Sequence, residues 1–262
     1  MTEPLLVERK GAIATVVLNR PAHRNAVTLA MWKRLAEISR ELDADPGVRA
    51  VVFRGAGEAA FSAGADIAEF ETCRNSSAAA RGYAEAFEGA LDAVAAIGPP
   101  TISLIRGFCV GGGLELAAST DLRVAADDAR FGVPIAQLGV LVGYREMRRL
   151  AALAGPGPVL DLLLTARLVG AADALRMGLV TETCPPGEVE SRVAALAERI
   201  SGLAPLVHRW HKRILRTVLE NPALRGLGPE ERDLPLACFD TADFQEGRRA
   251  FLEKRPPRFE GR

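Results

Sequence analysis

GFCVGGGLEL, at residues 107–116, is the stretch of this chain that decides the fold. It follows the apolar run TISLIR at residues 101–106 and leads into a helix that we expect at residues 113–119. Three consecutive glycines clear side chains from the helix entrance, so unpaired backbone N–H groups and the positive end of the helix dipole face outward. The segment therefore predicts a strand, a turn and a helix start that attracts developing negative charge.

Strand and helix patterns alternate on both sides of this segment. Apolar and β-branched runs predict strands, and apolar residues at helical spacing predict helices. The expected strands are residues 12–18, 49–54, 101–106 and 122–125, and the expected helices are 28–42, with Thr28 as N-cap, 76–97 and 113–119. Strands regularly separated by helices indicate the α/β class with largely parallel pairing.

Beyond about residue 144 the pattern becomes helical. The expected helices are residues 146–153, 159–166, 189–201, 205–219 and 241–253, with a loop at 221–228. We therefore expect an α/β core over residues 1–200 and a helical C-terminal region over residues 201–262.

Composition limits the class of protein. A chain of 262 residues with 48% apolar and only 5% aromatic residues is typical of one large soluble domain with a core of Ala, Val and Leu. Lys plus Arg and Asp plus Glu both total 33, so no charge excess favours binding to nucleic acid or to an anionic membrane.

The four cysteines and the N-terminus point to the cytoplasm. Cys73, Cys109, Cys184 and Cys238 are scattered without CxxC pairs, which predicts reduced thiols and no zinc site. The segment that begins at Met1 has no basic region followed by a long apolar core, and no apolar run is long enough to span a bilayer. His208 and His211, three residues apart on an expected helix, have no acidic cluster nearby, so we predict no metal.

A second segment of small residues, FSAGAD at residues 61–66, also brings backbone close to a ligand or a neighbouring segment. Together with LNRP (18–21), RNA (24–26), GGGLEL (111–116) and the tail AFLEKRPP (250–257), it resembles the crotonase superfamily of enoyl-CoA hydratases and isomerases along nearly the whole chain. The resemblance implies a spiral of ββα units, a helical C-terminal region for oligomerisation and active-site cover, and a homotrimer or a dimer of trimers.

The resemblance also implies an acyl-CoA or enoyl-CoA substrate, with coenzyme A as part of the substrate and no separate cofactor. The amides of Ala65 and Gly112 match the positions that hold the thioester oxygen, and Glu115 matches a glutamate that acts on substrate or water. Such chemistry needs preorganised donors for the enolate oxygen, each worth ~10² to 10³ in rate. The positions implied to contact the substrate are Arg24, Ala63, Ala65, Asp66, Ile67, Gly111, Gly112, Ile135, Phe251 and Lys254.

Some of these positions also have ordinary structural explanations. Arg24 can pair with a phosphate of the coenzyme or stay a solvated surface residue. Asp66 fits a local cap or turn better than an acid catalyst. Phe251 and Lys254 match tail residues that cover the adenine end of the coenzyme, in some relatives from a neighbouring subunit.

One position departs from the pattern. Hydratases of this superfamily usually carry a second glutamate after a Phe-Gly-x-Pro stretch, and here that position is Ile135. Loss of one acid/base group typically costs ~10² to 10⁴ in rate, which speaks against hydration by the usual route with two glutamates. Tyr144 and Glu146 are candidates for a replacement acid, against ordinary surface or helix N-terminal roles.

Several functions therefore stay open. Hydration fits a rearranged water site, whereas double-bond isomerisation needs only one base. Decarboxylation of a malonyl-type thioester also passes through an enolate, and Arg145 is placed to meet its carboxylate. A non-catalytic relative that binds coenzyme A or RNA is the alternative from another class, with Arg145, Arg148 and Arg149 as a local basic patch.

Overall fold

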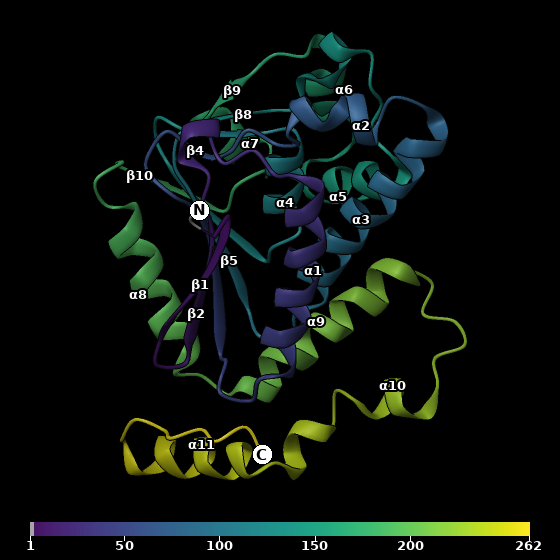
Figure 1. The fold of residues 1–262 in the computed structure, drawn as a ribbon. Coiled ribbons are helices and arrows are strands. Elements are labelled where there is room, and N and C mark those ends of the chain that lie inside the picture. Colours follow the sequence, from purple (N-terminus) through teal and green to yellow (C-terminus); the bar gives the residue numbers. More distant parts are fainter. Residues whose placement is uncertain (1–2) are drawn as a thin grey trace.

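The chain forms two β-sheets, and the strands in the middle of the chain alternate between them (Figure 1). The computed structural model describes residues 3–262; Met1 and Thr2, the start of the segment that we considered for a leader, lie outside the described residues. The first sheet has the order β1 (Leu5–Lys10), β2 (Ile13–Leu18), β3 (Ala50–Gly55), β5 (Thr101–Ile105), β7 (Leu122–Ala126) and β10 (Glu182–Cys184). The second has the order β4 (Ala60–Ser62), β6 (Phe108–Val110), β8 (Arg130–Gly132) and β9 (Val169–Gly170).

The order of strands along the chain makes a spiral. β3, β5 and β7 are parallel neighbours in the first sheet, and each is followed by a parallel neighbour of the second sheet, namely β4, β6 and β8. A helical segment then closes each turn: α2 (Phe70–Cys73) with α3 (Ser77–Ala96), then α4 (Gly112–Ala118), then α5 (Tyr144–Ala154) with α6 (Pro156–Thr165). Each turn thus delivers a strand–strand–helix unit, and the loops after β4 and β6 lie beside one another.

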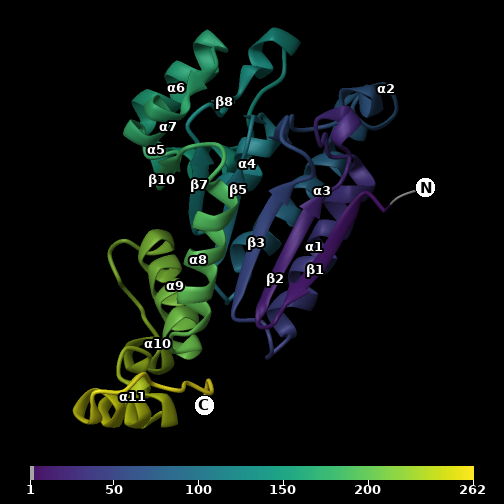
Figure 2. The same cartoon turned by 90° about the vertical axis from the view of Figure 1, so that its left-hand side faces the viewer.

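Helices cover both faces of the first sheet (Figure 2). Successive side chains of a strand point to opposite faces, and β3 shows this directly. Val51 and Phe53 join the core beneath α1 (Leu29–Ala44) and α3, whereas Ala50 and Val52 join the core beneath α8 (Val189–Ser201). The buried strands are therefore apolar on both sides, which is why they read as continuous apolar runs in the sequence.

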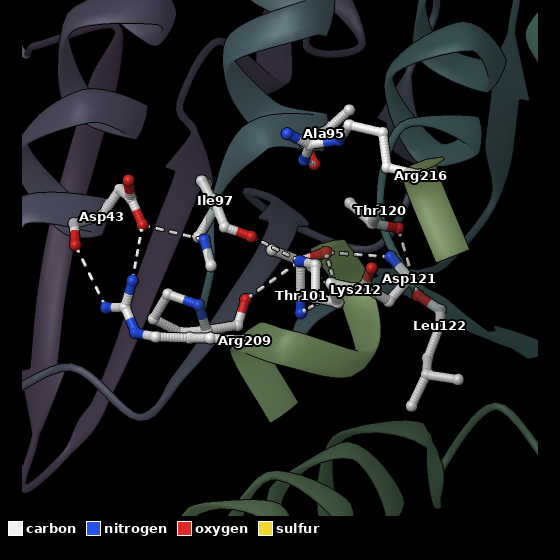
Figure 3. Close-up of polar contacts among 12 residues, drawn as sticks. Asp43, Ala95, Ile97, Thr101, Thr120, Asp121, Leu122, Arg209, Lys212 and Arg216 are labelled. Atoms are coloured by element: carbon white, nitrogen blue, oxygen red, sulfur yellow. Dashed lines mark hydrogen bonds and ion pairs between the residues drawn. The ribbon is translucent and has the colours of Figure 1, made fainter. Parts of the chain in front are cut away.

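Helix α9 (Pro205–Glu220) is fastened to the core by polar contacts (Figure 3). Lys212 donates to the carboxylate of Asp121 at 2.7 Å and to the carbonyls of Ile97 and Pro99. Arg209 forms an ion pair with Asp43 at 2.9 Å. Arg209 also donates to the carbonyl of Asp43 in the last turn of α1, and Ile97 is the C-cap of α3, so both basic residues satisfy carbonyls at helix ends.

The rest of the C-terminal region extends away from the sheets. α10 (Pro229–Asp233) and α11 (Ala242–Glu253) follow α9, whereas α7 (Ala171–Arg176) belongs to the core and packs against β9 and β10. In both views α11 lies at the end of the molecule opposite α2, with the last residues running back along it (Figures 1 and 2). Asp243, which is 4% exposed, accepts hydrogen bonds from the backbone of Glu260 and Gly261 and holds this tail.

The α/β class and the helical C-terminal region predicted from the sequence are confirmed. The expected strands and helices are present within a few residues, although α5 and α6 begin earlier than predicted. The short strands β4, β6, β8, β9 and β10, the exposed strand β1 and the short helices α2, α7 and α10 were not predicted. Short helical turns at η1 (Pro21–His23), η2 (Ile67–Glu69), η3 (Pro134–Leu138) and η4 (Ala237–Asp240) were not predicted either.

Over residues 3–262, none of the helices is both long and apolar enough to cross a membrane.

Candidate active site

A pocket opens where the loops after β4 and β6 meet. Its cavity volume is about 290 Å³, and its wall includes Ala65, Gly112 and Glu115 together with residues of α3 and of the segment before α5. A larger hollow of about 810 Å³ lies between α11 and the C-terminal tail, but it contains no residue of the two glycine-rich segments. The smaller pocket is therefore the one in which the predicted chemistry is possible.

Two backbone amides converge on this pocket. A Cβ placed on Gly112 would lie 3.5 Å from the nitrogen of Ala65, which shows how close the two loops come. Within residues 3–262 neither the Ala65 N–H nor the Gly112 N–H donates a hydrogen bond. Two adjacent free N–H groups at a pocket wall, one of them at a helix start, can receive an oxyanion.

Buried polar contacts hold the Ala65 loop in place. Asn25 is fully buried and its amide donates to the carbonyls of Ala56 and Ala60 at 3.0 and 2.7 Å. The Ser62 hydroxyl donates to the Asn25 carbonyl at 2.8 Å and accepts from the Gly64 N–H at 3.1 Å. The loop is therefore fixed before any ligand arrives, as electrostatic preorganisation requires.

Two glycines allow the loops to approach. Gly64 has φ +91°, and a Cβ there would lie 2.8 Å from the Gly112 nitrogen. A Cβ on Gly113 would lie 2.4 Å from the carbonyl oxygen of Ser62. Any side chain at either position would push the two amide-bearing loops apart.

Glu115 supplies a carboxyl group inside the pocket. It lies in the first turn of α4 and is only 6% exposed. Burial raises the pKa of Glu115 to about 8, and the negative charge of Glu146 adds to the increase. A carboxyl with a pKa near the working pH can both give and take a proton, which suits general acid/base catalysis.

Two further carboxyl groups line the same pocket. Glu146, in the first turn of α5, is 3% exposed, and Glu88 enters from α3. Ile135 also lines the pocket, so the position of the usual second glutamate is present but apolar. Tyr144, the other residue considered as a replacement acid, is 98% exposed and does not line the pocket, because it lies two residues, or about 200°, around the helix from Glu146.

Arg74 is a pocket residue that the sequence analysis missed. Its guanidinium lies over the rings of Phe70 and Tyr83, at 4.5 and 4.8 Å from their centroids. It comes from the turn between α2 and α3, where no motif or spacing marks it. Arg145, by contrast, pairs with Asp92 at 2.6 Å and with Glu88 at 3.4 Å, so its charge is already engaged.

Comparisons with known proteins agree with this geometry. Residues 8–262 match the family model described as enoyl-CoA hydratase/isomerase. The chain belongs to the enoyl-CoA hydratase/isomerase family. The family match and the relatives support an enzyme for coenzyme A thioesters, and they do not favour the alternatives of a single-base isomerase, a decarboxylase or a non-catalytic binding protein.

Individual relatives cover the chain almost completely. A probable enoyl-CoA hydratase of Mycobacterium tuberculosis is 36% identical over 261 residues, covering 98% of each chain. A crotonyl-CoA hydratase of Syntrophomonas wolfei is 34% identical over 257 residues, again covering 98% of each. The crystal structure of an enoyl-CoA hydratase/carnithine racemase from Magnetospirillum magneticum superposes with a TM-score of 0.96 at 40% identity, covering 100% of this chain and 97% of that one.

The residues that the family resemblance assigns to the coenzyme lie partly around this pocket. Ala63 and Gly111 line it, and so does Ile67, which is 55% exposed. Arg24 is exposed, in a left-handed conformation, and its guanidinium lies 5.1 Å from the ring centroid of Phe108. These positions suit a long ligand that enters from the surface.

Asp66 lies in the same loop but has local partners. Its carboxylate accepts from the Ala68 N–H at 3.1 Å and pairs with Arg20 at 2.8 Å. The hydrogen bond from Arg20 lowers the pKa of Asp66. The side chain thus caps η2, as predicted for a turn residue.

Phe251 and Lys254 are not brought to the pocket of their own chain. Phe251 is 83% exposed on α11, and Lys254 is the C-cap of that helix, at the opposite end of the molecule from α2 (Figure 1). Their expected contact with the coenzyme therefore requires a neighbouring subunit. In residues 3–262 no cluster of three or more His, Cys, Asp or Glu residues is arranged to hold a metal ion.

Proposed function

We propose that this member of the family hydrates a 2-enoyl-CoA thioester. The thioester oxygen would accept hydrogen bonds from Ala65 and Gly112, and Glu115 would transfer a proton at the acyl chain. The observation that carries the proposal is the pair of unpaired amides beside a buried carboxyl group in one pocket. The crotonyl-CoA hydratase relative supports a short enoyl chain as the first substrate to test.

The chemistry follows from where charge develops. Attack on the double bond moves electrons onto the thioester oxygen, and two fixed donors stabilise that enolate far better than mobile water. The apolar wall formed by Val142, Phe87 and Ile135 keeps the site dry and strengthens both hydrogen bonds. Coenzyme A leaves with the product, so we propose that no separate cofactor takes part.

Isomerisation of a 3-enoyl-CoA is the second candidate, and Ile135 favours it. A single base can remove a proton from C2 and return it at C4, whereas addition of water uses two acid/base groups. Glu115 alone could serve as the single base that isomerisation requires.

The test is direct incubation with both substrates. Crotonyl-CoA should lose its conjugated-enoyl absorbance and gain the mass of one water, and Glu115→Gln should abolish the gain. Conjugation of a 3-enoyl-CoA without a mass gain, together with inert crotonyl-CoA, would replace hydration by isomerisation. Tight binding of both thioesters without turnover would contradict both reactions.

We further propose a cytoplasmic homotrimer or dimer of trimers. The C-terminal region presents exposed apolar side chains that a monomer would leave in water, among them Leu215, Leu219, Phe239 and Phe244. In such an assembly Phe251 and Lys254 would reach the coenzyme of a neighbouring subunit. Light scattering coupled to size exclusion gives the number of subunits, and a monomer would contradict the proposal.

A further inference from the structure

Glu146 is a buried carboxyl group without a structural partner. It lies in the first turn of α5 at 3% exposure, and its Oε2 atom is buried with no hydrogen-bond partner within residues 3–262. Burying a carboxylate that has lost its water contacts is costly unless protein groups replace them. A chain gains nothing in stability from such a residue.

Helix capping does not account for Glu146. A glutamate at the third helical position can reach back to the N–H of the N-cap residue. Here the N-cap is Gly143, and within residues 3–262 its N–H donates no hydrogen bond to the Glu146 carboxyl. The Oε2 atom nevertheless lies so close to Gly143 that a Cβ on that residue would sit 2.4 Å from it.

The nearby cations do not neutralise Glu146 either. Arg145 and Arg149, on the same helix, pair with Asp92, and Arg145 also pairs with Glu88. Arg74 lies against aromatic rings across the pocket. The groups that face Glu146 from α3 and α4 are the carboxyls of Glu88 and Glu115. Burial raises the pKa of both, and the charge of Glu146 adds to each increase.

We infer that Glu146 is the second acid/base group of the hydration reaction and replaces the one that Ile135 cannot supply. The inference rests on the proposed function. Ile135 and Glu146 line the same pocket as Glu115, so the acid/base function moves from the turn of η3 to the first turn of α5 without leaving the site.

The proton balance follows from the two environments. Glu146 takes a proton from water as the water oxygen forms its bond to C3, and the double-bond electrons pass to the thioester oxygen. The enolate then collapses as Glu115 gives its proton to C2, so one water is added across the double bond. Glu115 is left ionised and Glu146 protonated, and transfer of that proton back, directly or through solvent, restores the starting state.

The principal test compares two isosteric variants. Glu146→Gln should lower kcat for crotonyl-CoA hydration by ~10² to 10⁴, the usual cost of losing an acid/base group. Glu85→Gln is the matched control, because Glu85 is exposed on the same helix α3 as Glu88 and does not line the pocket, so its rate should stay close to that of the wild type. Full hydration activity in Glu146→Gln would overturn the inference.

A partial reaction separates this inference from the proposed function. Exchange of the C2 hydrogens of butyryl-CoA with D₂O at pH 9 needs the amides and ionised Glu115 but no added water. Glu146→Gln should keep this exchange, with its pH midpoint lowered because a like charge is gone, whereas Glu115→Gln should lose exchange and hydration together. Loss of both in Glu146→Gln, or an unchanged midpoint, would show a merely structural role.

A relocation variant tests the same idea by gain of activity. The double variant Ile135→Glu, Glu146→Gln restores a carboxyl at the usual position, and it should recover hydration at least tenfold above Glu146→Gln alone, within the ~10² to 10⁴ that one such group is worth. Melting temperatures of all variants report folding. Failure to recover hydration in a folded double variant that still exchanges C2 hydrogens would contradict the inference.

Discussion

The pocket and the docking face of α9, formed by Lys212, Arg209 and their partners on the core, both contain charged side chains. The charges are paired at the docking face and unpaired in the pocket. At the docking face Lys212 meets Asp121 and two carbonyls, and Arg209 meets Asp43, so each charge has a partner (Figure 3). In the pocket the Oε2 atom of Glu146 has no partner, and Glu115 is buried beside another carboxyl. Paired charges hold the fold together, whereas unpaired ones are retained for chemistry.

The difference also appears in the pKa values. Burial lowers the pKa of Lys212, but the carboxylate of Asp121 opposes that shift. Burial raises the pKa of Glu115 to about 8, and the charge of Glu146 adds to the shift instead of opposing it. Removing a charge should therefore cost stability at the docking face and activity at the pocket.

The largest expected effect is on catalysis. Glu115→Gln should reduce turnover of crotonyl-CoA by ~10² to 10⁴, because the amide can neither give nor take the proton. Thioester binding should persist, since Ala65 and Gly112 are unchanged. Steady-state kinetics together with binding of a saturated acyl-CoA measure the two quantities. Turnover within threefold of the wild type would remove Glu115 from the mechanism.

The same substitution should stabilise the protein at high pH. The pKa of Glu115 is raised on folding, so the native state binds its proton more tightly than the unfolded chain. Stability is then lost as pH rises from about 4.5 towards 8, by an amount on the order of 3 to 4 kcal/mol. Urea unfolding at pH 5 and pH 8.5 should show Glu115→Gln becoming more stable than the wild type only at the higher pH. An equal difference at both pH values would contradict the raised pKa.

The docking face should show the opposite behaviour. Lys212→Met leaves Asp121 and two carbonyls without their cation, and we expect a loss of about 2 to 3 kcal/mol in the free energy of unfolding. The activity of the folded fraction should not change. Lys10→Met is the matched control, because the Lys10–Glu198 pair is exposed and is worth less than about 1 kcal/mol. Equal losses in both variants would mean that burial adds nothing to the Lys212 contacts.

The smallest expected effect lies outside both regions. Gly82 is an exposed residue inside α3, and an added Cβ would meet nothing within 4 Å. Gly82→Ala should therefore raise the free energy of unfolding by about 0.5 to 1 kcal/mol with no change in kcat. Thermal melts and kinetics at pH 7 give both values, and a drop in activity would show that α3 transmits surface changes to the pocket.

The elements that could be predicted from the sequence are those long enough for a periodic pattern of apolar residues to appear. Residues 101–106 and 28–42 have long apolar periodicities, and β5 and α1 lie there within two residues. β4, β6 and β8 have three residues each, too few for any period to appear, and β1 is largely exposed. Their pairing depends on contacts between distant segments.

The candidate site shows the same division. Ala65, Gly112 and Glu115 lie in motifs whose spacing can be read directly. Arg74 and Glu88 come from the α2–α3 region, where nothing local marks them. Tyr144 and Glu146 were equal candidates in the sequence because the choice between them depends on the rotation of α5 about its axis, which packing sets.

The account's central claim is that two free amides and a buried carboxyl group form an enolate-stabilising site. The most direct test follows purified wild-type protein and Glu115→Gln with crotonyl-CoA, by enoyl absorbance and product mass. We predict a product heavier by one water with the wild type and unchanged substrate with the variant. Equal hydration by both proteins would contradict the claim, because the reaction would then not depend on the carboxyl group at the centre of the site.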